Sequence, residues 1–221
     1  MNKLLVSRRR LPLAAAALCC VAVLSLQGCV EFIVGSAVVS TFAATDRRTL
    51  GAQTEDKAIA IKGENRVSKA LGDAAHVNVN SFNRRVLLTG EVADEAAKQT
   101  AARELSAVEG VLSVSNEIAI AGLSNFTARS NDALLTTKVK ASFVDTQGLF
   151  ASAFKVVTES GTVYLMGRVT PHEGDLAADV ASRISGVRKV VKVLEYLSDA
   201  ELKAMLVQPQ PAPENKSDTR N

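Results

Sequence analysis

The stretch VLLTGEV at residues 86–92 decides the fold, because it recurs as VYLMGRV at residues 163–169. The offset between the two stretches is 163 − 86 = 77. Further along, VEGV at residues 108–111 aligns with ISGV at residues 184–187, an offset of 184 − 108 = 76. A repeat at a nearly fixed offset indicates two copies of one small structural unit.

Each copy begins with a helical pattern that leads into two short strands. The apolar residues at near-helical spacing are Ala58, Ile61, Val67 and Leu71 in the first copy, and Leu135, Val139 and Phe143 in the second. In the second copy this pattern predicts a helix over residues 131–144 with that apolar stripe buried in the core. The two strands alternate apolar and polar residues, and the joints at Asn83-Arg84 and Ser160-Gly161 suit hairpin turns.

A second helix and a third strand complete each copy. The helix starts at Asp94 in the first copy and at Thr170-Pro171 in the second, and it ends near Gly110 or Gly186. The third strands are predicted over residues 111–120 and 187–196. The fold class is therefore α+β, with two tandem αββαβ sandwiches, each a layer of helices on a three-stranded sheet. Because each unit is near the lower size limit for independent folding, we expect the two to support each other.

The segment at residues 1–28 has the pattern of a lipoprotein signal peptide. Basic residues between Lys3 and Arg10 precede an apolar run at residues 11–26, and LQGC at residues 26–29 resembles the lipobox, in which the cysteine is acylated and cleavage falls just before it. An ordinary secreted protein with an incidental cysteine is the alternative. Cys29 would then be an orphan thiol, because the other two cysteines leave with the signal. We therefore predict lipidation, with palmitate among the acyl chains, at Cys29.

These signals divide the chain into five parts. They are a signal peptide (1–28), an acylated N-terminus and linker (29–54), a first domain (55–122), a second domain (125–196), and a short helix with a disordered, proline-rich tail (197–221).

The charge of the chain argues against nucleic acid as a partner. The net charge of +3 includes four basic residues of the signal, so the mature chain carries 3 − 4 = −1. The two domains differ: residues 55–122 hold 8 basic and 10 acidic residues (8 − 10 = −2), and residues 125–196 hold 9 and 7 (9 − 7 = +2). The second domain is the better partner for anionic headgroups.

No residue pattern predicts enzyme chemistry, a cofactor or a metal. The two histidines, His76 and His172, stand at non-equivalent places in the repeat, and neither has a motif around it. We interpret both as surface or internally satisfied side chains. Carboxylates such as Asp94, Glu95 and Asp175 lie at helix starts, where the helix dipole favours negative charge. The chain also lacks the cysteine and histidine clusters of structural zinc sites.

The strand–Gly–Val signature, the later Val/Ile-x-Gly-Val motif and the duplicated αββαβ order resemble the BON domain of bacterial envelope proteins. The segments that extend this resemblance to dual BON-domain outer-membrane lipoproteins are LQGCV (26–30), ATDR (44–47), SND (130–132), TTKV (136–139) and VYLMG (163–167). The resemblance implies binding to an anionic phospholipid membrane, a role in envelope integrity, and attachment to the outer membrane with the periplasmic face as the default.

The resemblance also points to the first helix of the second domain as the lipid-contacting element. Leu134, Thr137, Lys138 and Ala141 fall beside the predicted core stripe of this helix, and an apolar residue next to lysine suits insertion among headgroups. Lipoproteins of this type carry an aromatic residue where Leu134 stands, and leucine is a weaker interfacial anchor. The alternative for the residues is a partly buried Leu134 on a solvated face. The alternative for the function is a protein-interaction adaptor that docks onto outer-membrane assembly machinery.

Two glycines occupy equivalent places in the central strand signature. A glycine within a strand usually marks a bulge or a close backbone approach, so we interpret Gly90 and Gly167 as structural residues. A bulky replacement is expected to loosen or unfold the domain.

Overall fold

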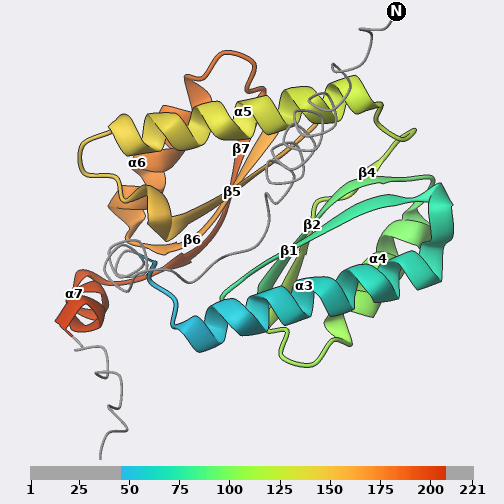
Figure 1. Cartoon of the computed structure of the whole chain (residues 1–221), viewed down its shortest axis with the longest axis horizontal. Helices are drawn as coiled ribbons and strands as arrows, with labels where there is room; N and C mark the ends of the chain where they lie inside the picture. Colours follow the sequence, from blue (N-terminus) through green and yellow to red (C-terminus); the bar gives the residue numbers. More distant parts are fainter. Residues whose placement is uncertain (1–45, 208–221) are drawn as a thin grey trace, which may run out of the picture. The chain divides into compact units, whose positions relative to one another are not determined.

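The computed structural model describes residues 46–207, so Cys29 and the proline-rich tail lie outside the described residues. The first repeat comprises α3 (Leu50–Leu71), η1 (Gly72–Ala74), β1 (His76–Phe82), β2 (Arg85–Val92), α4 (Glu95–Ser106), β3 (Ser113–Asn116) and β4 (Ala119–Ile120). The second comprises α5 (Phe126–Asp145), η2 (Ala151–Ala153), β5 (Phe154–Glu159), β6 (Thr162–Val169), α6 (Pro171–Ser182) and β7 (Lys189–Tyr196), followed by α7 (Asp199–Val207). The predicted α+β class and the duplicated αββαβ order are confirmed (Figure 1). Within residues 46–207 no helix has both the length and the apolar character to cross a membrane.

Each repeat has the same sheet topology. The central strand, β2 or β6, pairs antiparallel with the strand before it and parallel with the strand after it. The hairpin turns have positive φ at both central residues: 49° and 64° at Asn83 and Arg84, and 47° and 74° at Ser160 and Gly161. Two positive φ values define a type I′ turn, whose twist matches that of the flanking strands. The predicted hairpins are therefore confirmed.

The structure differs from the prediction at three places in the first repeat. Helix α3 begins at Leu50, with Thr49 as its N-cap, upstream of the expected domain start at residue 55. Ile61 belongs to the exposed side of this helix, because Asp56, Ile59, Gly63 and Val67 form the buried one. The third strand is also interrupted between β3 and β4, although both pair with β2 in one register (113 − 85 = 28 and 119 − 91 = 28).

The helix ends also fall short of the predicted glycines. Helices α4 and α6 end at Ser106 and Ser182, each four positions before Gly110 or Gly186 (110 − 106 = 4 and 186 − 182 = 4). A turn fills the interval in each repeat, and the two glycines adopt φ values of 90° and 102° within it. The glycines therefore serve the turn that leads into the third strand.

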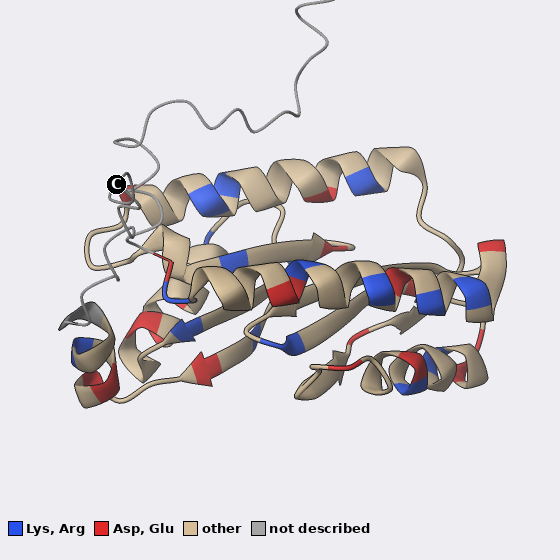
Figure 2. Cartoon of the chain, turned by 60° about the horizontal axis from the view of Figure 1, so that its bottom comes forward, with Lys and Arg blue, Asp and Glu red and all other residues tan. Residues whose placement is uncertain are grey.

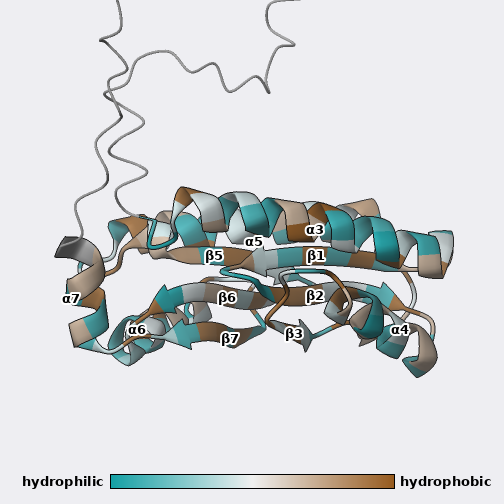
Figure 3. Ribbon diagram, turned by 90° about the horizontal axis from the view of Figure 1, so that it is seen from below, coloured by the Kyte–Doolittle hydropathy of each residue, from teal (hydrophilic) through white to brown (hydrophobic). Residues whose placement is uncertain are grey.

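Alternation along the strands gives each sheet two buried faces. One face packs on its own two helices and forms the core of the repeat (Figure 3). In the central strands these positions are Val86, Leu88 and Val92, and Val163, Leu165 and Val169, all at most 1% exposed. Such a face is what an αββαβ unit needs to fold.

The opposite faces of the two sheets meet in a third cluster, which joins the repeats. Its buried members are Phe82 and Leu87 from the first repeat and Tyr164 and Met166 from the second. Polar contacts surround it: the Asn83 side chain donates to Glu195 at 2.7 Å. This cluster supports the expectation that the two small units stabilise each other, since each hides apolar sheet surface of the other.

A buried aspartate in the first helix of each repeat holds the hairpin turn. Asp132 accepts hydrogen bonds from the backbone N–H groups of Ser160 and Gly161, both at 2.8 Å. Asp56, at the equivalent position (132 − 56 = 76), accepts from Asn83 N at 2.7 Å and Arg84 N at 2.8 Å. The carboxylates therefore fix the helix relative to the sheet in both repeats.

The two signature glycines lie where the backbone at or just before the start of the preceding strand comes very close. A Cβ on Gly90, whose φ is +114°, would overlap the carbonyl oxygen of His76. A Cβ on Gly167 would lie 2.6 Å from the carbonyl oxygen of Ala153. This geometry supports a structural role for both glycines.

We predict that Gly167→Val destabilises the protein by about 1–3 kcal/mol, because the new side chain must push the backbone at Ala153 away. The midpoint of thermal unfolding should fall by several degrees, roughly 2–4 °C per kcal/mol for a chain of this size. Gly122→Val is the matched control, because a Cβ there meets no atom within 4 Å. Equal midpoints for Gly167→Val and Gly122→Val would contradict the close-approach argument.

We also predict an acid-sensitive contribution from Asp56. Burial opposes ionisation, but hydrogen bonds from Ser81, Arg84 and Arg48 outweigh it, so the pKa of Asp56 lies below its ordinary value. A lowered folded-state pKa gives stability that is present at neutral pH and is lost as the pH falls below about 4. Asp56→Asn should therefore cost about 1.5–3 kcal/mol at pH 7 and flatten the loss of stability on acidification.

Denaturant titrations of both proteins between pH 7 and pH 3 measure this effect. Asp73→Asn is the control, because Asp73 is exposed in η1. The same pH dependence in the wild type and in Asp56→Asn would rule out a role for this carboxylate.

Candidate functional site

Helix α5 presents one face to the core and the other to solvent. Asn125 caps its start, accepting from the backbone N–H of Ala128 at 2.9 Å. The predicted stripe of Leu135, Val139 and Phe143 is buried, and the Phe143 ring meets Phe154 of β5 edge to face at 5.4 Å. Because this stripe fixes the rotation of the helix, it also decides which residues face outward.

All four predicted lipid-contacting residues lie on the exposed side of α5. Leu134 is 60% exposed, and Thr137, Lys138 and Ala141 are exposed as well. Leu134 is therefore more exposed than the alternative expected, although the solvated face in that alternative agrees with these exposures. The four positions belong to one surface, since residues three and four apart share a helix face.

Two exposed apolar residues that the sequence patterns did not single out extend this surface. Phe126, at the start of α5, is 79% exposed, and Val144, near its end, is 73% exposed. At about 100° per residue both lie roughly 80° from Leu134 and on the same side of it. We call Phe126, Leu134, Thr137, Lys138, Ala141 and Val144 the outer face of α5.

The cations of α5 at Lys138 and Lys140 are free to meet an anionic partner. Both are exposed, and neither forms an ion pair with another described residue. Figure 2 shows basic positions along α5 in blue. Positive charge continues inward at Lys155 of β5, where burial and the nearby Arg48 lower the pKa of the ammonium group. The second domain therefore offers cations beside exposed apolar groups, in line with its net charge.

The segment just before α3 binds to the second domain. Arg47 forms a two-pronged ion pair with Glu173 of α6, at 2.6 and 2.8 Å, and donates to the carbonyl of Arg168 at 2.9 Å. Both charged side chains are buried, with exposed fractions of 7% and 8%. Burial raises the pKa of Glu173, but the hydrogen bonds from Arg47 and Thr170 and the charge of Arg47 together outweigh it, so the pKa lies below its ordinary value. The guanidinium also lies 5.7 Å from the ring centroid of Phe150.

The next residue, Arg48, binds to the first domain. It pairs with Asp56 at 2.8 Å and stacks over the ring of Phe82, 4.0 Å from its centroid. Adjacent arginines thus connect the incoming chain to both repeats. Sequence patterns pointed to no such role, because single arginines in a polar connector carry no periodicity.

The structure also places the two histidines. His172 is exposed at the start of α6. His76 is half-buried and lies 3.0 Å from Glu91 through Nδ1, in agreement with the interpretation of a satisfied side chain. The partner was not visible from the sequence, because Glu91 is on the next strand.

The duplicated αββαβ architecture defines a class of small twin-domain α+β proteins, and the sequence comparisons identify its family. The profile of the BON domain matches residues 60–122 and 131–198. The chain therefore belongs to the BON-domain family, as its sequence motifs indicated.

Three curated relatives give the context of this family. The chain is 42% identical to the outer membrane lipoprotein DolP of Haemophilus influenzae over 189 residues, which cover 84% of this chain and 97% of the relative. It is 33% identical to the 21 kDa hemolysin of Actinobacillus pleuropneumoniae, covering 69% of this chain and 79% of the relative. It is 28% identical to the osmotically-inducible protein Y of Escherichia coli, covering 62% and 70%.

The relationship to an outer membrane lipoprotein along nearly its whole length identifies the kind of protein. This chain is an envelope-associated lipoprotein that is lipid-anchored at the outer membrane, as predicted. None of the three relatives bears the name of an enzyme.

Proposed function

We propose that this lipoprotein binds anionic phospholipid through the outer face of α5 and thereby supports the integrity of the envelope. The observation that carries the proposal is the exposure of Leu134, at 60%, close to Lys138, which forms no ion pair within residues 46–207. A helix that lies at a membrane surface needs such a combination, because the apolar group enters the acyl boundary while the cation meets phosphate.

The magnitudes favour a weak contact that depends on a tether. Burying one leucine contributes about 1.5–3 kcal/mol, and each lysine near an anionic surface adds about 1 kcal/mol. These sums are too small for stable attachment of a free protein, but a tether raises the effective concentration of the helix at the membrane.

Acylation of Cys29 supplies this tether in our proposal. Only the short segment at residues 30–45 separates the cysteine from the start of the described chain. Arg47 then binds Glu173 and contacts Phe150, which follows α5. The tether is therefore joined to the second domain through Arg47 as well as to the first through Arg48, and the choice of α5 over α3 rests on Leu134 and Lys138.

We predict that Leu134→Glu weakens binding to vesicles that contain anionic phospholipid by about tenfold, the equivalent of losing one buried leucine. The assay is sedimentation of the unlipidated mature protein with vesicles of phosphatidylglycerol and phosphatidylcholine. Ile61→Glu is the matched control, because Ile61 is exposed to 61% on α3. Binding should also fall at high salt and disappear with phosphatidylcholine alone.

Unchanged binding after Leu134→Glu, with a loss after Ile61→Glu, would move the site to the first domain. Equal sedimentation with neutral and anionic vesicles would contradict the whole proposal. The adaptor function would then be the better explanation, and recovery of outer-membrane assembly proteins with the lipoprotein would be its test.

A separate measurement tests the anchor. Mass spectrometry of the lipoprotein isolated from membranes should find that the signal peptide has been removed and that Cys29 is the first residue. Cys29 should carry fatty acyl chains and no free thiol. Cys29→Ser should release the protein from membranes. Retention of residues 1–28, or an unmodified Cys29, would remove the tether from the proposal without affecting the vesicle assay.

A further inference from the structure

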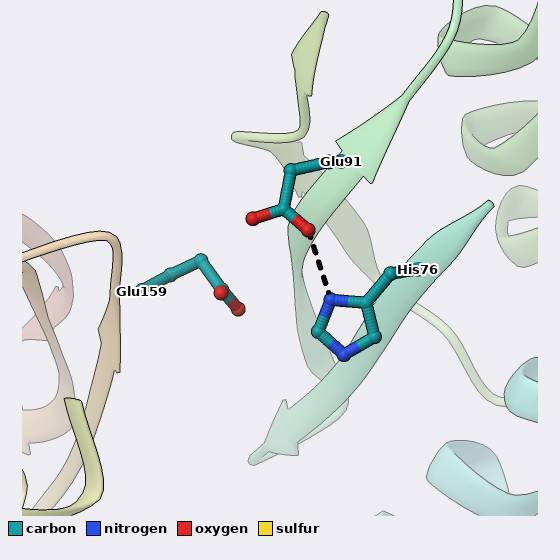
Figure 4. Close-up of side chains that lie close together, drawn as sticks. All are labelled: His76, Glu91 and Glu159. Atoms are coloured by element: carbon teal, nitrogen blue, oxygen red, sulfur yellow. Dashed lines mark hydrogen bonds and ion pairs between the residues drawn. The ribbon is translucent and has the colours of Figure 1, made fainter. Parts of the chain in front are cut away.

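Three ionisable side chains from different strands converge where the two sheets face each other. His76 begins β1, Glu91 is next to last in β2, and Glu159 ends β5 of the second repeat. Figure 4 shows their polar ends turned toward one another. One donor atom from each side chain lies within 4.8 Å of the other two, and His76 Nδ1 is 3.0 Å from Glu91 Oε2.

This cluster places two buried carboxylates beside a single imidazole. Glu91 and Glu159 are only 3% and 8% exposed, yet neither pairs with a lysine or arginine among residues 46–207. Arg129 lines the adjoining cavity but forms no ion pair with them in the described part of the chain. Two buried carboxylates beside one imidazole are costly without a further cation or proton.

One carboxylate oxygen has no hydrogen-bond partner among the described residues. Glu91 Oε2 accepts from His76 and from the backbone N–H of Ser124 at 3.4 Å, whereas Glu91 Oε1 is buried and lacks a hydrogen bond. The buried hydroxyl of Ser124, the residue whose N–H reaches Glu91, also lacks one. Buried polar atoms are nearly always satisfied, so an unpartnered carboxylate oxygen close to a second carboxylate points to a missing ligand.

The cluster is accessible and its members are held in place. A cavity of about 450 Å³ is lined by His76 and Glu159, which gives an ion a path from solvent. The Asn78 side chain donates to Glu159 Oε2 at 2.8 Å and so orients this carboxylate from the first repeat. Such a hydrogen bond is typical of the support around metal ligands.

From this geometry we propose that His76, Glu91 and Glu159 bind a zinc ion that links the two BON domains. One imidazole nitrogen with two carboxylates is a donor set that Zn²⁺ accepts, with a water as the fourth ligand. Donors on a tetrahedral zinc with bonds of about 2.1 Å lie about 3.4 Å apart. A separation of up to 4.8 Å therefore closes with a movement of about 1.4 Å, within the reach of a glutamate side chain.

The ion would cross-link the two domains. Two ligands come from the first sheet and one from the second, so binding favours the docked arrangement over separated domains. The inference is independent of lipid binding, because the outer face of α5 contributes none of the ligands.

The test uses the purified full-length lipoprotein in detergent, first stripped with a chelator. Titration with ZnCl₂ in a calorimeter should give one ion per chain, and thermal unfolding should shift upward with zinc. Zinc-edge X-ray absorption should show nitrogen and oxygen ligands at about 2.0–2.2 Å and no sulfur. MgCl₂ at the same concentration should leave the unfolding midpoint unchanged, because Mg²⁺ prefers six oxygens.

Variants assign the ligands. His76→Asn and Glu159→Gln should each weaken zinc binding at least tenfold, since loss even of a supporting group around a ligand costs about 10–100-fold in affinity. His172→Asn is the control, because His172 is exposed and stands at a non-equivalent place in the repeat; it should change the affinity less than about twofold, the ordinary scatter for a surface substitution.

Any of four outcomes would overturn the proposal. The first three are absence of saturable zinc binding, equal affinity in the wild type and both ligand variants, and an equal upward shift with Mg²⁺. A fourth is a Glu159→Gln variant that is more stable than the wild type in chelator while zinc binds neither protein. Burial and the negative charge of Glu91 both raise the pKa of Glu159. In that case a proton shared by the two carboxylates would reduce the charge of the cluster, and no metal would be involved.

Discussion

The bond between a helical aspartate and the turn of a hairpin is the constraint on which both domains depend. Asp56 and Asp132 each reach from the first helix of a repeat to two backbone N–H groups of the turn. Those N–H groups belong to the two turn residues, which have positive φ and lie between the paired strands. The carboxylate satisfies them and sets the position of the helix along the sheet. The orientation of α5, and with it the exposure of Leu134, follows from this attachment and from the buried stripe beneath it.

The second organising feature is that each sheet is buried on both faces. One face carries the helices of its own repeat, and the other contributes Phe82, Leu87, Tyr164 or Met166 to the cluster between the repeats. The surfaces left for partners are then mainly the outer faces of helices. The polar residues of the inner faces need partners across the interface, which explains why Asn78, Asn83 and Glu195 bond between repeats.

Sequence patterns predicted the elements but not the contacts that join them. The repeat, the hairpins and the stripe of Leu135, Val139 and Phe143 were evident because they rest on periodicity and on turn chemistry. Periodicity failed at Ile61, where a glycine and an aspartate replace apolar residues on the buried face of α3. Asp56, Arg47 and the surroundings of His76 were invisible for another reason: their partners lie far away along the chain, on other strands and helices. Only the equivalence of Asp56 and Asp132 in the repeat offered a signal for the first of these.

The adjacent arginines before α3 have a mechanical consequence. Arg47 is fixed to the second domain and Arg48 to the first, at neighbouring positions of the chain. A pull on the chain upstream of Asp46 therefore reaches the two domains in parallel, and neither has to carry the load through the other. Separation of the second domain requires breaking the buried Arg47–Glu173 pair as well as the contact between the sheets. The attachment point thus keeps the two domains in one arrangement when force is applied through the chain.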